Sequence, residues 1–249
     1  MLDIEFRFAG LSEAYQTVFT EAAKRWCELL PEPLPEVDYE GETTDGIIID
    51  AQGVRLDGPG QVLGSAGPTV LRPGATGLPV AGIMMFDLDD LAQLESANTL
   101  VSVILHEMGH VLGIGTLWEE RGLLAGTGSD DPVFTGDNAK RAYQELRGEA
   151  DLVDVPVANT GGPGTREGHW REAVFQDELM SGFLSGTTQP LSRVTAGSLE
   201  DLGYVVDYSA ADTYDLPEGE ALSLETPKRP FCRHVLRPKP YTLPKSALV

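Results

Sequence analysis

The sequence predicts an α+β domain, with a mixed sheet and packed helices in the first half of the chain and a mostly irregular second half. Three observations predict this class. Strand and helix periodicities follow one another up to about residue 113. Beyond that point, stretches rich in Gly separate only short elements. The 249 residues are 41% hydrophobic, which is enough to bury the core of one large domain.

The first half of the chain has the pattern of a sheet with a helix packed on it. Apolar residues alternate over residues 2–8, as in a strand, and Ser12 can cap a helix of regular apolar spacing. The runs 46–51 (GIIIDA) and 80–86 (VAGIMMF) predict two further strands. Residues 57–79 are dense in Gly and Pro, so we expect a constrained surface segment there.

The stretch from Leu100 to Trp118 predicts an interior helix that carries chemistry. Its apolar residues leave almost no polar face, and Gly113 follows its last turn. His106 and His110 are four residues apart and so lie on one face, with Glu107 beside them. This pattern predicts a zinc site with a base, and the alternative is a core helix with hydrogen-bonded histidines.

The second half of the chain contains fewer regular elements. A short amphipathic helix is expected at 139–146, and a loop rich in Gly at 159–164. Residues 192–202 predict a final core helix, and 204–208 a short strand. Beyond residue 216 periodicity is lost, so we expect an extended tail that crosses the surface.

We therefore expect one domain over residues 1–215, with an upper subdomain at about 1–113 and a lower one at about 114–215. Residues 216–249 form the predicted tail. The two cysteines, Cys27 and Cys232, allow one disulfide, although sequence alone does not show that they meet.

Composition restricts the partners. The net charge of -21 argues against nucleic acid and anionic membranes and favours basic substrate segments. No apolar run is long enough to span a membrane, and no signal peptide pattern opens the chain. We expect a monomer that is secreted or extracellular, its signal or pro-segment lying outside the given chain, with a cytoplasmic location left open.

A catalytic zinc needs three protein ligands and one open position, so His106 and His110 leave one ligand to be found. A compact motif would place a third histidine at position 116, which is Thr116. Two other histidines exist. His169 precedes a tryptophan, whereas His234 lies among arginines in the tail, as expected of a surface residue.

At this point the residues resemble the metzincin zinc peptidases, and within them the leishmanolysin-like group. Members of that group carry His-Glu-x-x-His-x-x-Gly, a long insertion, a third zinc-binding histidine and a later methionine turn. The residues that match this pattern are His106, Glu107, His110, Gly113, His169 and Met180. Gly182 departs from other metzincins, some of which have a tyrosine there that binds the metal.

The resemblance implies a metzincin-like domain, in which a twisted mixed sheet, an active-site helix and a backing helix lie above a cleft. A mostly irregular lower subdomain with a C-terminal helix lies below it. The resemblance also implies that the protein is a zinc-dependent endopeptidase acting on proteins or peptides. Zinc would activate a water, Glu107 would be the general base, and Met180 the apolar floor of the site. In related metzincins the strand before the active helix holds substrate at the sheet edge, which here would be Ile83, Met84 and Met85.

Other functions and sites stay open. One is a zinc-stabilised adhesion or binding module without turnover. Another is a zinc hydrolase whose third ligand is a carboxylate, Glu172 or Glu178. Asp57, in a tight Gly turn, with Asp87 and Asp90 is similar to the calcium loop of matrix-degrading metzincins. The alternative for these aspartates is a plain turn and a helix cap.

Overall fold

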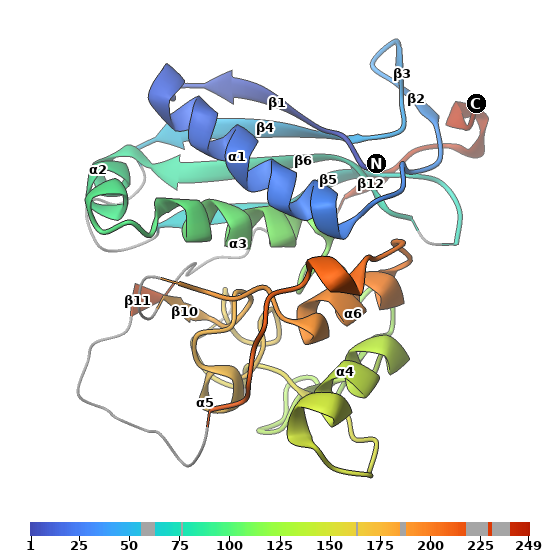
Figure 1. Ribbon diagram of the computed structural model, residues 1–249. Coiled ribbons are helices and arrows are strands. Elements are labelled where there is room, and N and C mark those ends of the chain that lie inside the picture. Colours follow the sequence, from blue (N-terminus) through green and yellow to red (C-terminus); the bar gives the residue numbers. More distant parts are fainter. Residues whose placement is uncertain (56–62, 76, 163, 185–187, 218–228, 231–239) are drawn as a thin grey trace.

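The computed structural model describes residues 1–55, 63–75, 77–162, 164–184, 188–217, 229–230 and 240–249 (Figure 1). Its upper part is a five-stranded sheet in the order β1-β4-β6-β5-β12. The strands are β1 Ile4–Ala9, β4 Ile47–Val54, β5 Gly64–Leu71, β6 Pro79–Asp87 and β12 Tyr241–Thr242. Strands β1, β4 and β6 are parallel, whereas β5 is antiparallel to β6. The α+β class with a mixed sheet is confirmed.

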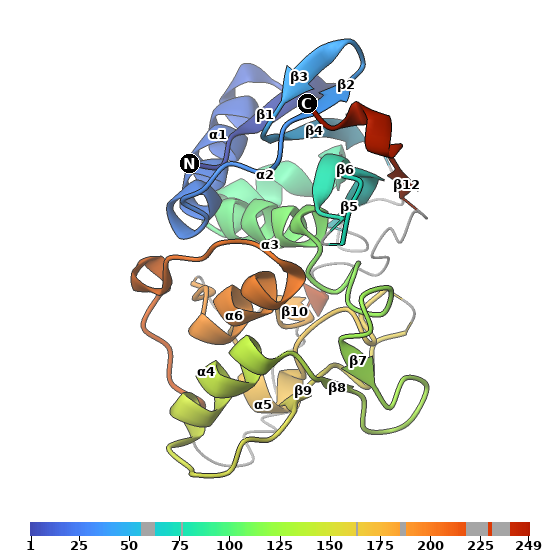
Figure 2. The same ribbon diagram turned by 90° about the vertical axis from the view of Figure 1, so that its right-hand side faces the viewer.

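Helices α1 (Glu13–Leu29) and α3 (Leu100–Leu112) lie on the same face of this sheet (Figure 2). Ser12 caps α1 as predicted, since its side chain accepts a hydrogen bond from the backbone N–H of Tyr15. Trp26 of α1 is fully buried, and its indole N–H donates to the carbonyl of Leu105 at 3.1 Å. The backing helix is thus hydrogen-bonded to the helix that carries the histidine motif.

Helix α3 is an interior helix, as its apolar sequence predicts. Its last turn ends at Gly113, which has φ 112° and so adopts the left-handed cap conformation that favours glycine. The N-cap is Thr99, with Asn98 before it at φ 56°. The chain therefore makes a left-handed turn at Asn98 just before the helix begins.

The predicted substrate strand is not at the edge of the sheet. Strand β6, which contains Ile83, Met84 and Met85, pairs with β4 on one side and β5 on the other. This prediction was wrong because a strand's neighbours depend on pairing between distant segments, which its own sequence does not reveal. Strand β5 lies outside β6, and β12 covers only its Val70–Leu71 end.

Strand β5 also corrects the expectation of a surface segment without regular structure at 57–79. Gly64 to Leu71 forms eight residues of strand despite its Gly and Pro content. Pro68 lies beside an irregularity in the register of the β5 and β6 pair, where the ladder tolerates a residue without an N–H.

The lower part contains short elements around a second set of packed helices. The helices are α4 Asp137–Arg147, α5 Glu172–Phe175 and α6 Arg193–Leu202. The strands are β7 Leu124–Ala125, β8 Val133–Phe134, β9 Val155–Pro156, β10 Phe183–Leu184 and β11 Arg229–Pro230. The predicted helices at 139–146 and 192–202 are confirmed. The predicted strand at 204–208 is wrong, because its end turns into a 3₁₀ helix, η1, at Tyr208–Ala210.

The remaining upper elements lie at the ends of the sheet. They are β2 Val37–Tyr39, β3 Glu42–Thr44, α2 Leu88–Ser96 and the 3₁₀ helix η2 Lys245–Ala247. In the tail, β11 pairs with β10 of the lower part and β12 pairs with β5 of the upper sheet. The division into two subdomains and a tail stays a prediction.

Three predictions fall partly outside the described residues. The residues concerned are Asp57 of the predicted calcium site, Cys232 of the possible disulfide and His234, which was expected to lie on the surface. Cys27 is half-buried, and burial raises the pKa of its thiol to about 11.

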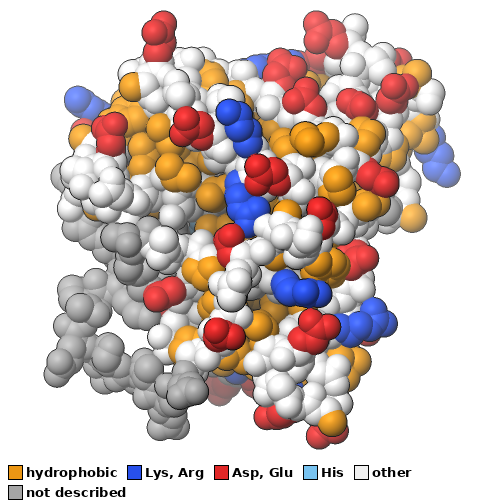
Figure 3. All heavy atoms as spheres, in the orientation of Figure 1, with side chains coloured by type: hydrophobic (Ala, Val, Ile, Leu, Met, Phe, Trp, Pro, Cys, Tyr) orange, Lys and Arg blue, Asp and Glu red, His pale blue; other side chains and the backbone are white. Residues whose placement is uncertain are grey.

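No helix among the described residues is both long and apolar enough to cross a bilayer. Figure 3 shows acidic side chains spread over both parts of one face, in keeping with the net charge of -21.

Candidate metal centre

Three histidines from two distant segments meet in the interior. His106 and His110 come from α3, and His169 comes from the loop that precedes α5. All three are fully buried. Their Nε2 atoms form a triangle in which each of the three separations is 3.1 Å. Among the described residues this is the group of side chains that could hold a metal ion.

The other ring nitrogen of each histidine is fixed by a backbone carbonyl. The Nδ1 atoms of His106, His110 and His169 lie 2.7, 2.8 and 2.9 Å from the carbonyl oxygens of Leu179, Ile114 and Thr165 respectively. A carbonyl only accepts hydrogen bonds, so each Nδ1 carries the proton. In a neutral imidazole with its proton on Nδ1, Nε2 is the nitrogen whose lone pair can bind a metal.

The triangle fits zinc. Three neutral Nε2 lone pairs that face one another cannot all be satisfied by hydrogen bonds among themselves. Three Nε2 atoms that are each 3.1 Å from the others could together hold one zinc ion, which takes three protein ligands in catalytic sites. Burial, and then the two neighbouring imidazoles, hold the pKa of His106 well below its usual range, which favours the neutral ring that a metal requires.

Glu107 lies beside this group with its carboxylate inside the protein. Neither of its oxygens has a hydrogen-bond partner among the described residues, and burial raises its pKa well above the usual range. A β-carbon on Gly64 would lie 2.9 Å from Glu107 Cγ. Glycine in β5 therefore gives the Glu107 side chain its place next to the outer strand.

Met180 lies beneath α3, where the sequence leaves room for it. The residue is fully buried, and a β-carbon on Gly109 would lie 2.7 Å from its sulfur. The carbonyl of Met180 accepts a hydrogen bond from the backbone N–H of Trp170 at 2.9 Å. The predicted methionine therefore lies against the helix that carries two of the histidines and is bonded to the residue after the third.

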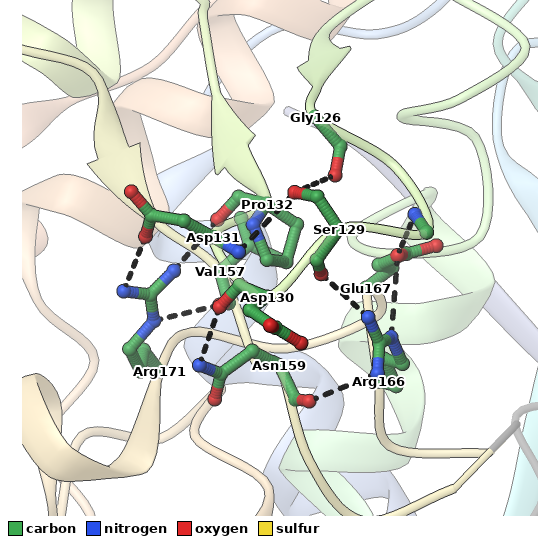
Figure 4. Close-up of polar contacts among 11 residues, drawn as sticks. Gly126, Ser129, Asp130, Asp131, Pro132, Val157, Asn159, Arg166, Glu167 and Arg171 are labelled. Carbon is green, nitrogen blue, oxygen red and sulfur yellow. Dashed lines mark hydrogen bonds and ion pairs between the residues drawn. The ribbon is translucent and has the colours of Figure 1, made fainter.

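The loop that carries His169 is held by charged side chains that the sequence analysis did not single out (Figure 4). Arg166 donates to the carbonyl oxygens of Ser129 at 2.5 Å and Asn159 at 3.2 Å. Glu167 Oε1 accepts from the backbone N–H of Gly128 at 2.7 Å. These contacts tie the turn after Thr165 to the loop between β7 and β8.

Arg171, two residues after His169, makes a second set of such contacts. It forms an ion pair with Asp131 at 2.7 Å, and it donates to the carbonyls of Val157 and Pro132. Nothing in the sequence distinguishes these arginines from others, because their partners are mostly backbone carbonyls of a distant loop.

The structure does not bring the rival carboxylates to the histidines. Both oxygens of Glu178 accept hydrogen bonds from Met180, Ser192 and Thr195. Glu172 begins the short helix α5 and is absent from the group of described side chains that could share a metal. A carboxylate as third ligand is not favoured.

The aspartates of the calcium prediction lie at the start of α2. Asp87 is its N-cap and accepts from the backbone N–H of Asp89 at 3.0 Å, and Asp90 is buried in the first turn. Helix capping by Asp87 is therefore confirmed. The calcium site stays a prediction, since Asp57 lies outside the described residues.

Comparison with known proteins gives three findings. A family model described as Leishmanolysin matches residues 72–226, which is more than half of the chain. A leishmanolysin homolog of Crithidia fasciculata is 32% identical over 124 residues, 47% of this chain and 19% of that protein. Metalloendoproteinase 1-MMP of Arabidopsis thaliana is 30% identical over 163 residues, 61% of this chain and 37% of that protein. The matched region thus spans well under half the length of both relatives.

Proposed function

The chain belongs to the leishmanolysin family, and from this premise we propose that it is a zinc-dependent endopeptidase that hydrolyses peptide bonds in proteins. The observation that carries the proposal is the triangle of three Nε2 atoms, each 3.1 Å from the others, together with the buried Glu107, which directly follows His106 on α3. Of the two relatives described above, one is named as a leishmanolysin homolog and the other as a metalloendoproteinase.

Three histidines would bind the metal, and one glutamate would transfer the proton. His106, His110 and His169 would hold zinc, which when bound acidifies a water molecule and polarises a carbonyl. The carboxylate of Glu107 accepts the proton of the attacking water and delivers it to the leaving amine. Burial of Glu107 favours this role, since it raises the affinity of the carboxylate for a proton.

The substrate would lie extended along β5. This strand is outside β6, and its Gly64 end contacts Glu107, whereas β12 covers only the Val70–Leu71 end. A peptide can add to such an edge through main-chain hydrogen bonds. The net charge of -21 favours basic segments, and we infer proteins or peptides as the substrates.

Three further expectations belong to this proposal. The protein would work as a monomer that is secreted or extracellular, and Asp57, Asp87 and Asp90 would hold a calcium ion. Helix capping by Asp87 and the burial of Asp90 do not require calcium. Calcium binding therefore has to be measured directly.

The competing function is a zinc-stabilised binding module without turnover. Incubation with unfolded casein separates the two functions, with three arms: protein alone, protein with a chelator, and chelated protein with zinc restored. We expect cleavage that the chelator stops and zinc restores. Binding of zinc without any cleavage in the three arms would favour the binding module.

A further inference from the structure

Glu178 is a fully buried carboxylate that accepts four hydrogen bonds. Its Oε2 accepts from the backbone N–H of Met180 at 2.5 Å. Its Oε1 accepts from the N–H and the hydroxyl of Ser192, at 3.1 and 2.7 Å, and from the hydroxyl of Thr195 at 2.5 Å. Burying a carboxylate raises its pKa, and the four donors act against that shift.

The direction of these bonds is fixed by the surrounding donors. The Thr195 hydroxyl oxygen accepts from the indole N–H of Trp170 at 2.8 Å, and the Ser192 hydroxyl oxygen accepts from the N–H of Thr195 at 3.3 Å. Both hydroxyl hydrogens are therefore directed to Glu178. Only acceptor atoms fit at this position. A glutamine side chain of the same size would place its NH₂ group, a donor, opposite an N–H or O–H that also donates.

The three-residue segment that begins at Glu178 also contacts both sources of the metal-binding histidines. The carbonyl of Leu179 accepts from Nδ1 of His106 at 2.7 Å. The carbonyl of Met180 accepts from the N–H of Trp170, which follows His169. The imidazole of His106 and the backbone that follows His169 are thus both bonded to a turn whose conformation is held by the Glu178 side chain.

We propose that Glu178 is a positioning residue of the metal centre, which locks the 178–180 turn and through it orients His106 and His169. The proposal rests on the proposed zinc site. Glu178 itself would touch neither the metal nor the substrate. It acts through Leu179 and Met180 on one side and through Thr195 and Trp170 on the other.

Glu178→Gln tests this role, with zinc affinity and cobalt spectrum as readouts. Zinc affinity is measured by competition with a chromophoric chelator, and cobalt(II) replaces zinc so that its visible spectrum reports the ligand geometry. We expect zinc to bind about 10-fold to 100-fold more weakly, with an altered cobalt spectrum, because partners of metal ligands have effects of this size.

The matched control is Asp201→Asn. Asp201 is a half-buried carboxylate in the same part of the molecule, and it accepts from the N–H groups of Asn138 and Ala139 at 2.9 and 3.0 Å. Its contacts do not lead to the histidines. This variant should lose stability while keeping wild-type zinc affinity and cobalt spectrum.

Thr195→Val serves as a second variant if Glu178→Gln fails to fold. It removes the link to Trp170 and should weaken zinc binding by about 10-fold, the lower end of the range for outer partners of metal ligands, whereas Thr195→Ser should keep wild-type affinity. Zinc affinity within 2-fold of wild type and an unchanged cobalt spectrum in the folded variant overturn the proposal. Failure of the wild-type protein to bind zinc would instead overturn the proposed function itself.

Discussion

The backbone of Gly115 lies directly against the carbonyl oxygen of Gly168, so that no room remains for a β-carbon on Gly115. Gly115 follows α3 and has φ 71°, a conformation that favours glycine. Gly168 precedes His169. The end of the helix that carries His106 and His110 therefore touches the backbone that carries the third histidine.

Gly115→Ala should weaken zinc binding and stability together. Gly122→Ala is the matched control, because Gly122 has φ 67° and nothing within 4 Å of its added β-carbon. Left-handed strain costs both variants about 1 kcal/mol, and the clash should cost Gly115→Ala a further 1 to 3 kcal/mol. Thermal melts and chelator competition measure the difference. Equal losses in the two variants would show that the contact with Gly168 has no importance.

His169→Ala should lower zinc affinity by about 100-fold or more, because two histidines from one helix leave the tetrahedral site incomplete. Glu172→Ala should leave zinc affinity unchanged. Chelator competition on both variants checks this. Unchanged affinity in His169→Ala, or a large loss in Glu172→Ala, would restore the carboxylate alternative.

Much of this architecture follows from local sequence patterns. Ser12 and Gly113 mark helix ends as predicted, and the spacing of His106 and His110 places both rings on one face. The identity of His169 as the third member of the group came from the resemblance to a family. Its position in the structure agrees with that assignment.

The rest depended on pairing between distant segments. Strand β5 was missed because Gly64 and Pro68 indicate loops, although here glycine makes room for Glu107. Because β5 was not predicted, β6 was predicted to be an edge strand. Glu178 was considered only as a metal ligand, because three of the four donors to its carboxylate come from α6 and the residue that precedes it, which are distant in sequence.

Calcium should stabilise the wild-type protein if the site at Asp87 and Asp90 exists, because a ligand that binds only the folded state raises its stability. Melts of zinc-loaded protein in calcium-free buffer and in about millimolar calcium measure the effect. Asp87→Asn should keep the helix cap and lose the calcium response. No shift in the wild type would show that these aspartates serve only α2.

Charge should govern the choice among otherwise equal peptides. The net charge of -21 predicts faster cleavage of a peptide with lysine flanks than of the same scissile sequence with glutamate flanks. Screening by about 0.5 M salt should remove most of the difference in kcat/KM. A ratio that salt leaves unchanged would point to specific pockets in place of the overall field.

Zinc titration of metal-free protein, with cleavage of unfolded casein as the readout, tests whether the three histidines and Glu107 form a zinc peptidase site. For the wild type, activity should rise with added zinc and stop rising at one zinc per chain. Glu107→Gln should also bind one zinc, yet cleave about 100-fold or more slowly, because the amide preserves size but cannot accept the proton. Cleavage by metal-free protein, or near wild-type turnover by zinc-loaded Glu107→Gln, would contradict the account.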